Sequence, residues 1–138
     1  MYLVDTNVIS EVRKGERANT GVRNFFGRTA SDGNDLYLSV VTIGELRRGV
    51  EMIRHRGGTA QAKRLEAWLS IVLKEYGQSV LPVDDDTGQL WGRLRVPHPA
   101  HALDKLIAAT ALIHDLIVVT RKVDDFVATG VQVLNPFE

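Results

Sequence analysis

The chain contains no cysteine among its 138 residues, so disulfide bonds, thiolate nucleophiles and thiolate metal sites are excluded. No segment approaches the roughly 20 apolar residues that a membrane-spanning helix needs. The N-terminus also lacks a basic region followed by a signal-type apolar run. We therefore expect a soluble, cytoplasmic protein with no membrane partner.

Neither sign of charge is in excess, because 17 Lys and Arg residues face 17 Asp and Glu residues. Any contact with an anionic polymer must therefore come from a local basic patch and not from the net charge. Hydrophobic residues make up 44% of the chain and charged residues 25%, which is typical of a folded globular protein. The length fits one domain of ordinary size, and we predict a single domain over residues 1–138.

Short apolar runs alternate with helical patterns along the chain. The predicted strands are Tyr2–Val4, Leu36–Ser39, Val80–Val83, Leu116–Thr120 and Val131–Leu134. The predicted helices cover residues 7–12, 18–28, 41–56, 59–76, 84–94 and 101–114, with a loop at 30–35 and a short turn or helix at 124–126. This alternation predicts an α/β fold with a parallel sheet of four to five short strands and helices on both faces. In such sheets the reactive site lies beyond the carboxyl ends of the strands.

Two acids stand close to predicted strand ends. Asp5 directly follows the first strand, where it could cap the next helix or belong to an acidic metal site. Glu45 lies near the start of the helix predicted at 41–56, where Thr42 and Glu45 match the spacing of a capping box. In the alternative interpretation Glu45 points toward Asp5. Spacing alone leaves both roles open for each acid.

Asp104 begins an apolar stripe, because Ile107, Ala108 and Ala111 follow it at helical spacing. We therefore predict that its carboxylate is partly buried. An unpaired buried charge is expensive, so this carboxylate requires a cation or several hydrogen-bond donors. The alternative is a first-turn acid stabilised by the helix dipole, which contributes about 0.3–1 kcal/mol.

Three acids from three separate elements would repel one another at one sheet edge, and a divalent cation would relieve that repulsion. Oxygen ligands, without cysteine and without a histidine pair on one helix face, suit Mg²⁺ or Mn²⁺ better than Zn²⁺. Such a site lowers the pKa of a bound water and clamps a phosphodiester during in-line attack. The acids therefore predict nuclease chemistry.

Four segments carry a resemblance to a known family: VDTNVISE, LSVVTIGELRRGVE, LDKLIAATALIHDL, and VVTRKVDDF followed by GVQVLNPF. In this order they resemble the PIN-domain ribonucleases, and in particular the FitB-like subgroup of VapC-type toxins of bacterial type II toxin–antitoxin pairs. The resemblance covers essentially the whole chain and implies a three-layer PIN-like fold. It also implies an Mg²⁺- or Mn²⁺-dependent endoribonuclease that forms homodimers and is inhibited by a small antitoxin protein.

The same resemblance implies that Asp5, Glu45 and Asp104 are the catalytic residues and metal ligands. Members of the family often carry a fourth acidic or amide residue shortly after the Thr-Arg pair that ends the fourth strand, and here that position is Lys122. A lysine there argues against a second tightly held metal. Candidate fourth acids are Asp124 and Asp125, of which the latter matches a common Asp-Phe pair. The family's supporting polar positions correspond to Thr6, Asn7 and Thr120, which also suit plain turn or cap roles.

An RNA substrate needs basic groups near the acids. The candidates are Arg47, Arg48, Arg93, Arg95 and Arg121, with His98 and His101 on the proline-containing loop. The family's antitoxins insert a C-terminal segment into a groove near the site. Here we expect that groove between the helices of residues 41–56 and 7–28, lined by Val40, Ile43, Leu46, Val50, Phe25 and Phe26.

Two alternatives belong to other functional classes. A receiver-type phosphoacceptor switch is suggested by Asp84-Asp85-Asp86 after the third strand, with Thr120 and Lys122 near the fourth. The single acid at the end of the first strand argues against it, because a receiver brings an acidic pair there. The other alternative is a catalytically inert PIN-like binding module in which the acids serve only as caps. Metal-dependent cleavage would distinguish the enzyme from both.

Overall fold

The computed structural model describes residues 1–138 and contains a five-stranded parallel sheet with the strand order β3-β2-β1-β4-β5. The strands are β1 (Tyr2–Val4), β2 (Leu36–Ser39), β3 (Val80–Leu81), β4 (Ile117–Val119) and β5 (Val133–Leu134). The α-helices are α1 (Thr6–Val12), α2 (Thr20–Asp32), α3 (Val40–His55), α4 (Thr59–Tyr76), α5 (Asp85–Leu94), α6 (Ala102–His114) and α7 (Val123–Val127). Two short 3-10 helices cover Gly15–Arg17 and Gly77–Ser79. The predicted α/β fold with a parallel sheet is confirmed.

Several element boundaries differ from the sequence prediction, and two of the differences have a clear local cause. Helix α2 continues to Asp32, through residues expected to form a loop, because Gly33 ends it with a left-handed backbone (φ 68°) and donates to the carbonyls of Thr29 and Ala30. Strand β3 stops at Leu81, since Pro82 has no N–H to continue the ladder.

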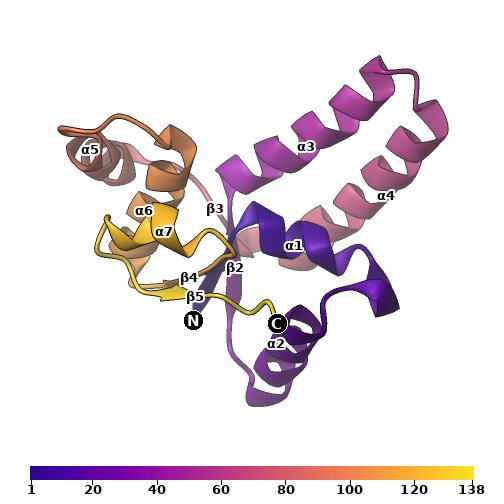
Figure 1. Ribbon diagram of the computed structural model, residues 1–138, viewed down its shortest axis with the longest axis horizontal. Helices are drawn as coiled ribbons and strands as arrows, with labels where there is room; N and C mark the ends of the chain where they lie inside the picture. Colours follow the sequence, from indigo (N-terminus) through magenta and orange to yellow (C-terminus); the bar gives the residue numbers. More distant parts are fainter.

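The sheet separates two hydrophobic clusters, and successive residues of β1 point to opposite faces. Val4 belongs to the larger cluster, which also receives side chains from α1, α2, α3 and α4. Leu3 belongs to the smaller cluster, which is built largely from α6, β4 and α7. Figure 1 shows the resulting arrangement, with the α3–α4 hairpin projecting to one side of the strands and α5, α6 and α7 on the other. No helix combines the length and the apolar character that crossing a membrane requires.

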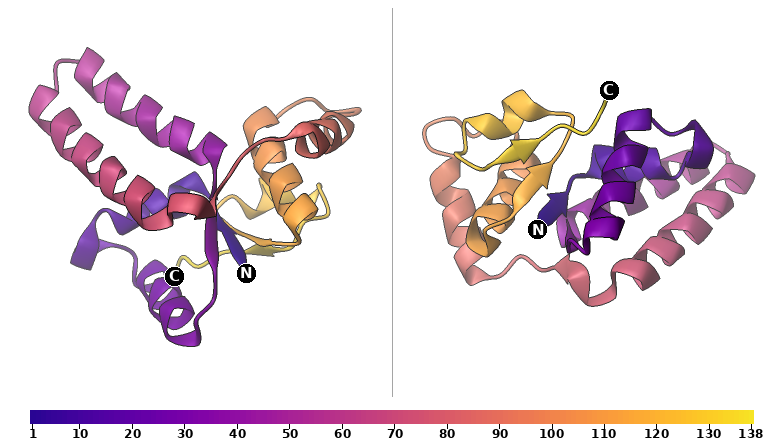
Figure 2. Two further views of the ribbon diagram at one scale, coloured as in Figure 1. Left: turned by 180° about the vertical axis from the view of Figure 1, so that it is seen from behind. Right: turned by 90° about the horizontal axis from the view of Figure 1, so that it is seen from below.

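The carboxyl ends of the central strands bring distant parts of the chain together. Val4 pairs with Val119 in the parallel ladder, so Asp5 and Thr120 follow at the same edge. The Asp5 N–H donates to the Val119 carbonyl at 2.9 Å and extends this pairing by one step. Helix α3 begins immediately after β2, without a loop, and reaches the same region (Figure 2). This edge therefore collects the first turns of α1 and α3 and the end of β4.

Candidate active site

Asp5 lies almost completely buried at the end of β1, with 1% of its surface exposed. Its Oδ1 accepts from the Thr6 N–H (2.8 Å), and its Oδ2 accepts from the Asn7 amide (3.0 Å) and the Thr120 hydroxyl (2.8 Å). Burial raises the pKa of Asp5, although the hydrogen bonds from Thr120 and Thr6 oppose that rise. The capping role is confirmed, because Asp5 is the N-cap of α1. The carboxylate is thus held by three donors, none of which carries a charge.

The predicted supporting residues form one hydrogen-bonded network around Asp5. The Thr120 hydroxyl accepts from the Asn7 amide (3.2 Å) and from the Lys122 N–H (3.0 Å) while it donates to Asp5. The Asn7 side-chain oxygen accepts from the Arg121 N–H at 3.0 Å. These bonds join the start of α1 to the segment after β4, so the network fixes the position of Asp5 relative to residues 120–122.

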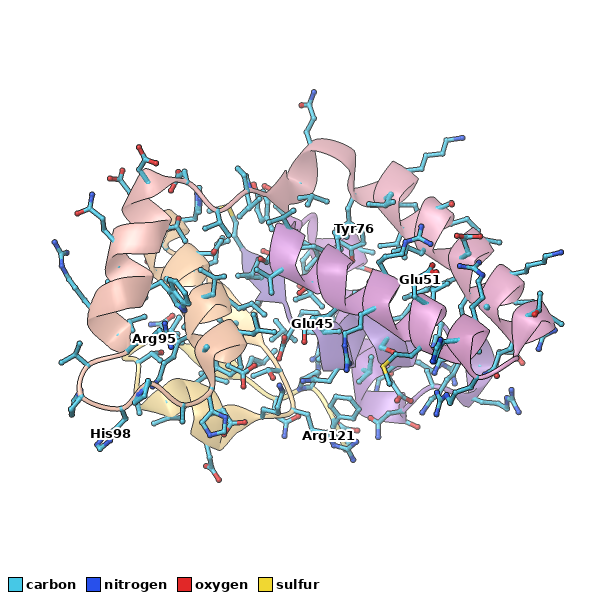
Figure 3. All side chains as sticks on the ribbon, turned by 90° about the horizontal axis from the view of Figure 1, so that it is seen from above. Glu45, Glu51, Tyr76, Arg95, His98 and Arg121 are labelled. Carbon is cyan, nitrogen blue, oxygen red and sulfur yellow. The ribbon has the colours of Figure 1, made fainter.

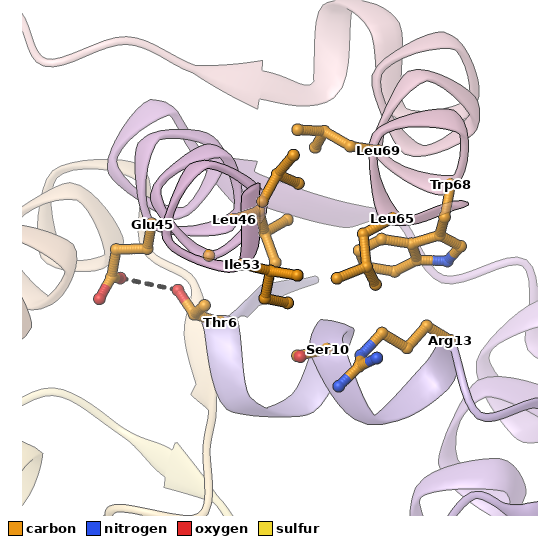
Figure 4. Close-up of a pocket in the computed structure, with 11 residues that line it drawn as sticks. Thr6, Ser10, Arg13, Glu45, Leu46, Ile53, Leu65, Trp68 and Leu69 are labelled. Carbon is orange, nitrogen blue, oxygen red and sulfur yellow. Dashed lines mark hydrogen bonds between the residues drawn. The ribbon is translucent and has the colours of Figure 1, made fainter. Parts of the chain in front are cut away.

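The capping-box interpretation of Glu45 is wrong. Helix α3 begins at Val40, and its N-cap is Ser39, whose hydroxyl accepts from the Val41 N–H at 3.0 Å. The N-cap therefore lies three residues before Thr42, and Glu45 is free for another role. Its Oε1 accepts from the Thr6 hydroxyl at 2.7 Å, a bond drawn in Figure 4. Glu45 thus faces the residue that follows Asp5.

Asp104 occupies the third position of α6 and is 9% exposed, as its apolar stripe predicts. Its Oδ1 accepts from the Lys122 ammonium at 3.0 Å. Burial alone would lower the pKa of Lys122, but the hydrogen bond and the negative charge of Asp104 outweigh it and raise that pKa. The buried carboxylate therefore has the cation that its position requires, supplied by the chain itself.

The ammonium of Lys122 links the three acids electrostatically. The charges of Asp5 and Glu45 add to that of Asp104 in raising the pKa of Lys122. We call Asp5, Glu45 and Asp104 the acidic centre. Its carboxylate oxygens are the hard donors that Mg²⁺ and Mn²⁺ prefer. The single positive charge of Lys122 does not neutralise the negative charges of the three carboxylates. The donor chemistry therefore fits a divalent cation.

His101, Asp104 and Asp125 are the one set of three potential metal ligands whose ligand atoms all lie within 4.8 Å of one another, and the predicted ligands Asp5 and Glu45 are not part of that set. His101 Nε2 lies 3.7 Å from Asp125 Oδ1, and His101 Nδ1 lies 4.0 Å from Asp104 Oδ2. The structure thus brings Asp125 next to the acidic centre. It leaves Asp124 exposed and without a hydrogen bond or ion pair. His101 is the N-cap residue of α6 and has a left-handed backbone (φ 57°), so helical spacing carried no signal for its place beside Asp104 and Asp125.

Comparison with known proteins agrees with this geometry. Residues 2–130 match the model of the PIN domain family. This chain belongs to the PIN domain family. The resemblance inferred from the four sequence segments is therefore confirmed.

Relatives of this PIN domain cover almost all of its length. Toxin FitB of Neisseria gonorrhoeae is 34% identical over 99% of each chain. VapC ribonuclease Y4jK of Sinorhizobium fredii is 33% identical over 100% of this chain and 99% of its own. The solved structure of FitAB bound to an IR36 DNA fragment superposes with a TM-score of 0.79 at 31% identity, over 100% of this chain and 96% of that chain. The fold prediction is confirmed as PIN-like.

The predicted RNA-binding residues of this PIN domain lie in different surroundings. Arg121 is exposed next to the acidic centre, with its guanidinium 4.5 Å above the Phe137 ring. Arg95 stacks at 4.7 Å on the Trp91 ring at the end of α5. Arg47 instead forms ion pairs with Glu66 (2.6 Å) and Glu51 (3.3 Å). Its charge is already neutralised, in contrast to that of Arg121.

Three further candidates from the sequence are exposed. Arg48 lies on α3, Arg93 in the last turn of α5, and His98 in the loop between α5 and α6. His98 contributes its carbonyl to a hydrogen bond from the Lys105 ammonium. Arg95 and His98 lie at the end of the molecule opposite Glu51, with Glu45 between them (Figure 3).

A largely apolar pocket of about 170 Å³ opens beside the acidic centre of the PIN domain, between α1, α3 and α4. Thr6 and Glu45 form one end of it, and Leu65, Trp68 and Leu69 of α4 form its wall (Figure 4). Of the residues expected to line the groove, Leu46 and Val50 line this pocket, whereas Val40, Ile43, Phe25 and Phe26 do not. Phe25 is buried in the larger hydrophobic cluster, and the second wall is α4 instead of α2.

The acidic run that suggested a receiver has a local structural role. Asp84 is the N-cap of α5, and its Oδ1 accepts from the Thr87 N–H at 2.9 Å. Asp85 and Asp86 are exposed in the first turn of that helix, where the helix dipole favours acids. Together with membership of the PIN domain family, this finding removes the basis for the receiver interpretation.

Proposed function

We propose that this PIN domain, which spans residues 1–138, is a metal-dependent endoribonuclease and the toxin of a cytoplasmic toxin–antitoxin pair. The observation that carries the proposal is one hydrogen-bonded network that joins the three acids from three separate elements. Thr6 donates to both Asp5 and Glu45. Lys122 donates to Asp104 through its ammonium and, through its backbone N–H, to the Thr120 hydroxyl that holds Asp5. Isolated helix caps would not form such a network. The names of the relatives, a toxin and a VapC ribonuclease, support the same assignment.

In this proposal Asp5 and Asp104 are the main ligands of Mg²⁺ or Mn²⁺, and Glu45 completes the site or positions the attacking water. When bound, a divalent cation supplies a water of lowered pKa and stabilises charge that develops on the phosphate. Thr6, Asn7 and Thr120 hold the acids in place before substrate arrives, which removes the cost of rearranging them during reaction.

The substrate phosphates need a positive charge outside the acids. Arg121 is suited to this role because it is exposed, and its backbone is fixed to Asn7 at the edge of the acidic centre. Arg93 and Arg95 could extend the contact along α5, since a single strand of RNA binds along a basic groove. Arg47 is not part of this surface, because Glu66 and Glu51 neutralise it.

The decisive experiment uses the purified, partner-free chain with total cellular RNA in Mg²⁺, in Mn²⁺ and in EDTA. We expect discrete cleavage that requires the metal and disappears in Asp5→Asn. Asp124→Asn is the matched control, since it also removes one aspartate charge but from an exposed residue that forms no hydrogen bond or ion pair. Equal cleavage by Asp5→Asn and the unchanged chain would refute the proposal. No cleavage under any condition would favour the inert binding module.

For the partner, we propose a small antitoxin that places an apolar segment in the pocket between α1, α3 and α4. The pocket ends at Glu45 and Thr6, so a polar or basic group at the tip of that segment would meet the acidic centre. The solved structure of FitAB bound to a DNA fragment supports a toxin–antitoxin complex that binds DNA. We also propose a homodimer of the toxin, which analytical ultracentrifugation of the isolated chain would test.

Capture of the antitoxin encoded by the adjacent reading frame tests the pocket. Trp68→Glu places a charge in the pocket wall and should abolish capture while RNA cleavage persists. Ile71→Glu is the control, because Ile71 is 54% exposed on the same helix and does not line the pocket. Equal capture by the two variants would place the antitoxin elsewhere.

A further inference from the structure

Lys122 is the only lysine or arginine that forms an ion pair with a residue of the acidic centre. Its ammonium donates to Asp104 Oδ1 at 3.0 Å, and its backbone N–H donates to the Thr120 hydroxyl at 3.0 Å. The same hydroxyl donates to Asp5. Both the backbone and the side chain of Lys122 are therefore engaged with the site, which distinguishes this residue from a lysine that extends freely into solvent.

The charge of Lys122 decides how many cations the centre can hold. Within the acidic centre, three carboxylates and the ammonium paired with Asp104 leave two uncompensated negative charges, which a single divalent cation neutralises. The neighbouring carboxylate of Asp125 lies outside this count and faces His101 at 3.7 Å. A second divalent cation would give the centre an excess of positive charge and would lie close to the ammonium. Like charges separated by a few ångströms in a partly buried site repel strongly, because the effective dielectric constant there is far below that of water.

The position of the Lys122 ammonium also favours a single divalent cation. Asp104 offers Oδ1 to Lys122, which leaves Oδ2 on the side of His101. Oδ1 is thus already engaged with a positive charge at hydrogen-bond distance. Asp5 and Glu45 have only uncharged donors, so they retain their full negative charge for an added cation.

We propose that the Lys122 ammonium is a built-in cation of the acidic centre, which occupies one cation position beside Asp104 and limits the chain to a single divalent ion. The inference rests on the proposed function for the role of the acids as metal ligands. It goes beyond that function because it assigns Lys122 as the residue that sets the metal stoichiometry and affinity.

Calorimetric titration with Mn²⁺ tests this role without any measurement of cleavage. The unchanged chain should bind one Mn²⁺. Lys122→Gln should bind Mn²⁺ roughly tenfold more tightly, because a like charge is removed from the site. Lys122→Asp should bind a second ion, whereas Lys122→Arg should retain the single ion and its affinity. Thermal melting of each variant confirms that it is folded.

Lys105→Gln is the matched control, since it removes the same charge from the residue next to Asp104. The Lys105 ammonium donates to the His98 carbonyl and forms no ion pair with the acids, so its loss should leave Mn²⁺ binding unchanged. Equal Mn²⁺ affinity in the unchanged chain and Lys122→Gln, including no binding by either, would overturn the proposal. Metal-dependent RNA cleavage that requires Asp5 would show in that case that the proposed function itself still stands.

Discussion

The two sides of the acidic centre are held by different kinds of contact. On one side, Asp5 and Glu45 accept only from hydroxyl, amide and backbone N–H groups. On the other, Asp104 accepts from an ammonium whose side chain is 45% exposed. Neutral donors orient a carboxylate without cancelling its charge, whereas an ammonium does both. The first side therefore keeps its charge for an added cation, and the second is already partly neutralised.

This difference follows from where the donors stand in the chain. Thr6 and Asn7 follow β1 directly and Thr120 follows β4, so short, rigid stretches of backbone place their small side chains. Lys122 reaches Asp104 with a long side chain from the segment between β4 and α7. The neutral side is consequently preorganised by the sheet, while the charged side depends on one flexible side chain.

The largest effect is expected from removing the charge of Asp5. Asp5→Asn retains a side chain that can cap α1, but it removes a full charge from the acidic centre. We expect the activation free energy of cleavage to rise by at least about 2–4 kcal/mol, the change typical when a principal electrostatic group is lost. Single-turnover cleavage of the identified RNA measures this loss. A circular dichroism spectrum equal to that of the unchanged chain confirms that the variant is folded. Unchanged cleavage by the folded variant would contradict the prediction.

The neutral side can be weakened by a substitution that removes only a hydroxyl. Thr120→Val leaves the buried Oδ2 of Asp5 without its closest donor, and we expect a loss of about 1–3 kcal/mol in the free energy of unfolding. Urea denaturation in EDTA measures it. Thr110→Val is the control, because Thr110 is also fully buried but its hydroxyl bonds only to the Leu106 carbonyl of its own helix. Equal losses in the two variants would show that the hydrogen bond to Asp5 stabilises the fold no more than an ordinary buried hydroxyl does.

A smaller effect concerns the pH dependence of stability. Since burial raises the pKa of Asp5 above its ordinary 3.8, the folded protein binds a proton there more readily than the unfolded chain. The ionised carboxylate therefore costs stability above the folded-state pKa, and this cost disappears as the pH falls toward 3.8. Asp5→Asn has no charge to desolvate, so its free energy of unfolding relative to the unchanged chain should rise as the pH increases from 3.8 toward neutral. Its NH2 group faces a hydrogen-bond donor in either orientation, which adds a loss of stability that does not depend on pH. Urea denaturation in EDTA across this pH range measures the difference in free energy of unfolding between the two chains. A difference that stays constant with pH would contradict the prediction.

Much of this site could be predicted from the sequence because its parts are local. Asp5 and Asp104 are marked by a strand end and by an apolar stripe, and the boundaries of β1, β2 and α4 agree with those predicted. The role of Ser39 as the N-cap of α3 was missed, since the same stretch of sequence also fits a capping box at Thr42 and Glu45. Only the three-dimensional start of α3 decides between them.

Other features depended on contacts between distant segments. The pocket wall comes from α4, whose periodicity shows an apolar face but not the neighbour that this face meets. The ion pair between Lys122 and Asp104 joins a segment after β4 to the first turn of α6, and the spacing of the two residues carries no signal for it. The sequence therefore indicated the acids and, by resemblance, put Lys122 near them, whereas the ion pair of Lys122 with Asp104 could be found only from the fold.

The smallest effect is expected from an ion-pair network far from the acidic centre. Glu66 on α4 joins Arg47 and Arg54 of α3 at 2.6 and 3.1 Å, but all three side chains are substantially exposed. Solvent and salt screen such pairs, so Glu66→Gln should change the urea midpoint less than Thr120→Val does and leave cleavage unchanged. Glu75→Gln, an exposed acid without an ion pair, sets the baseline. A loss at Glu66 larger than that at Thr120 would reverse the comparison, because exposed charge would then stabilise this PIN domain more than the buried neutral network beside Asp5.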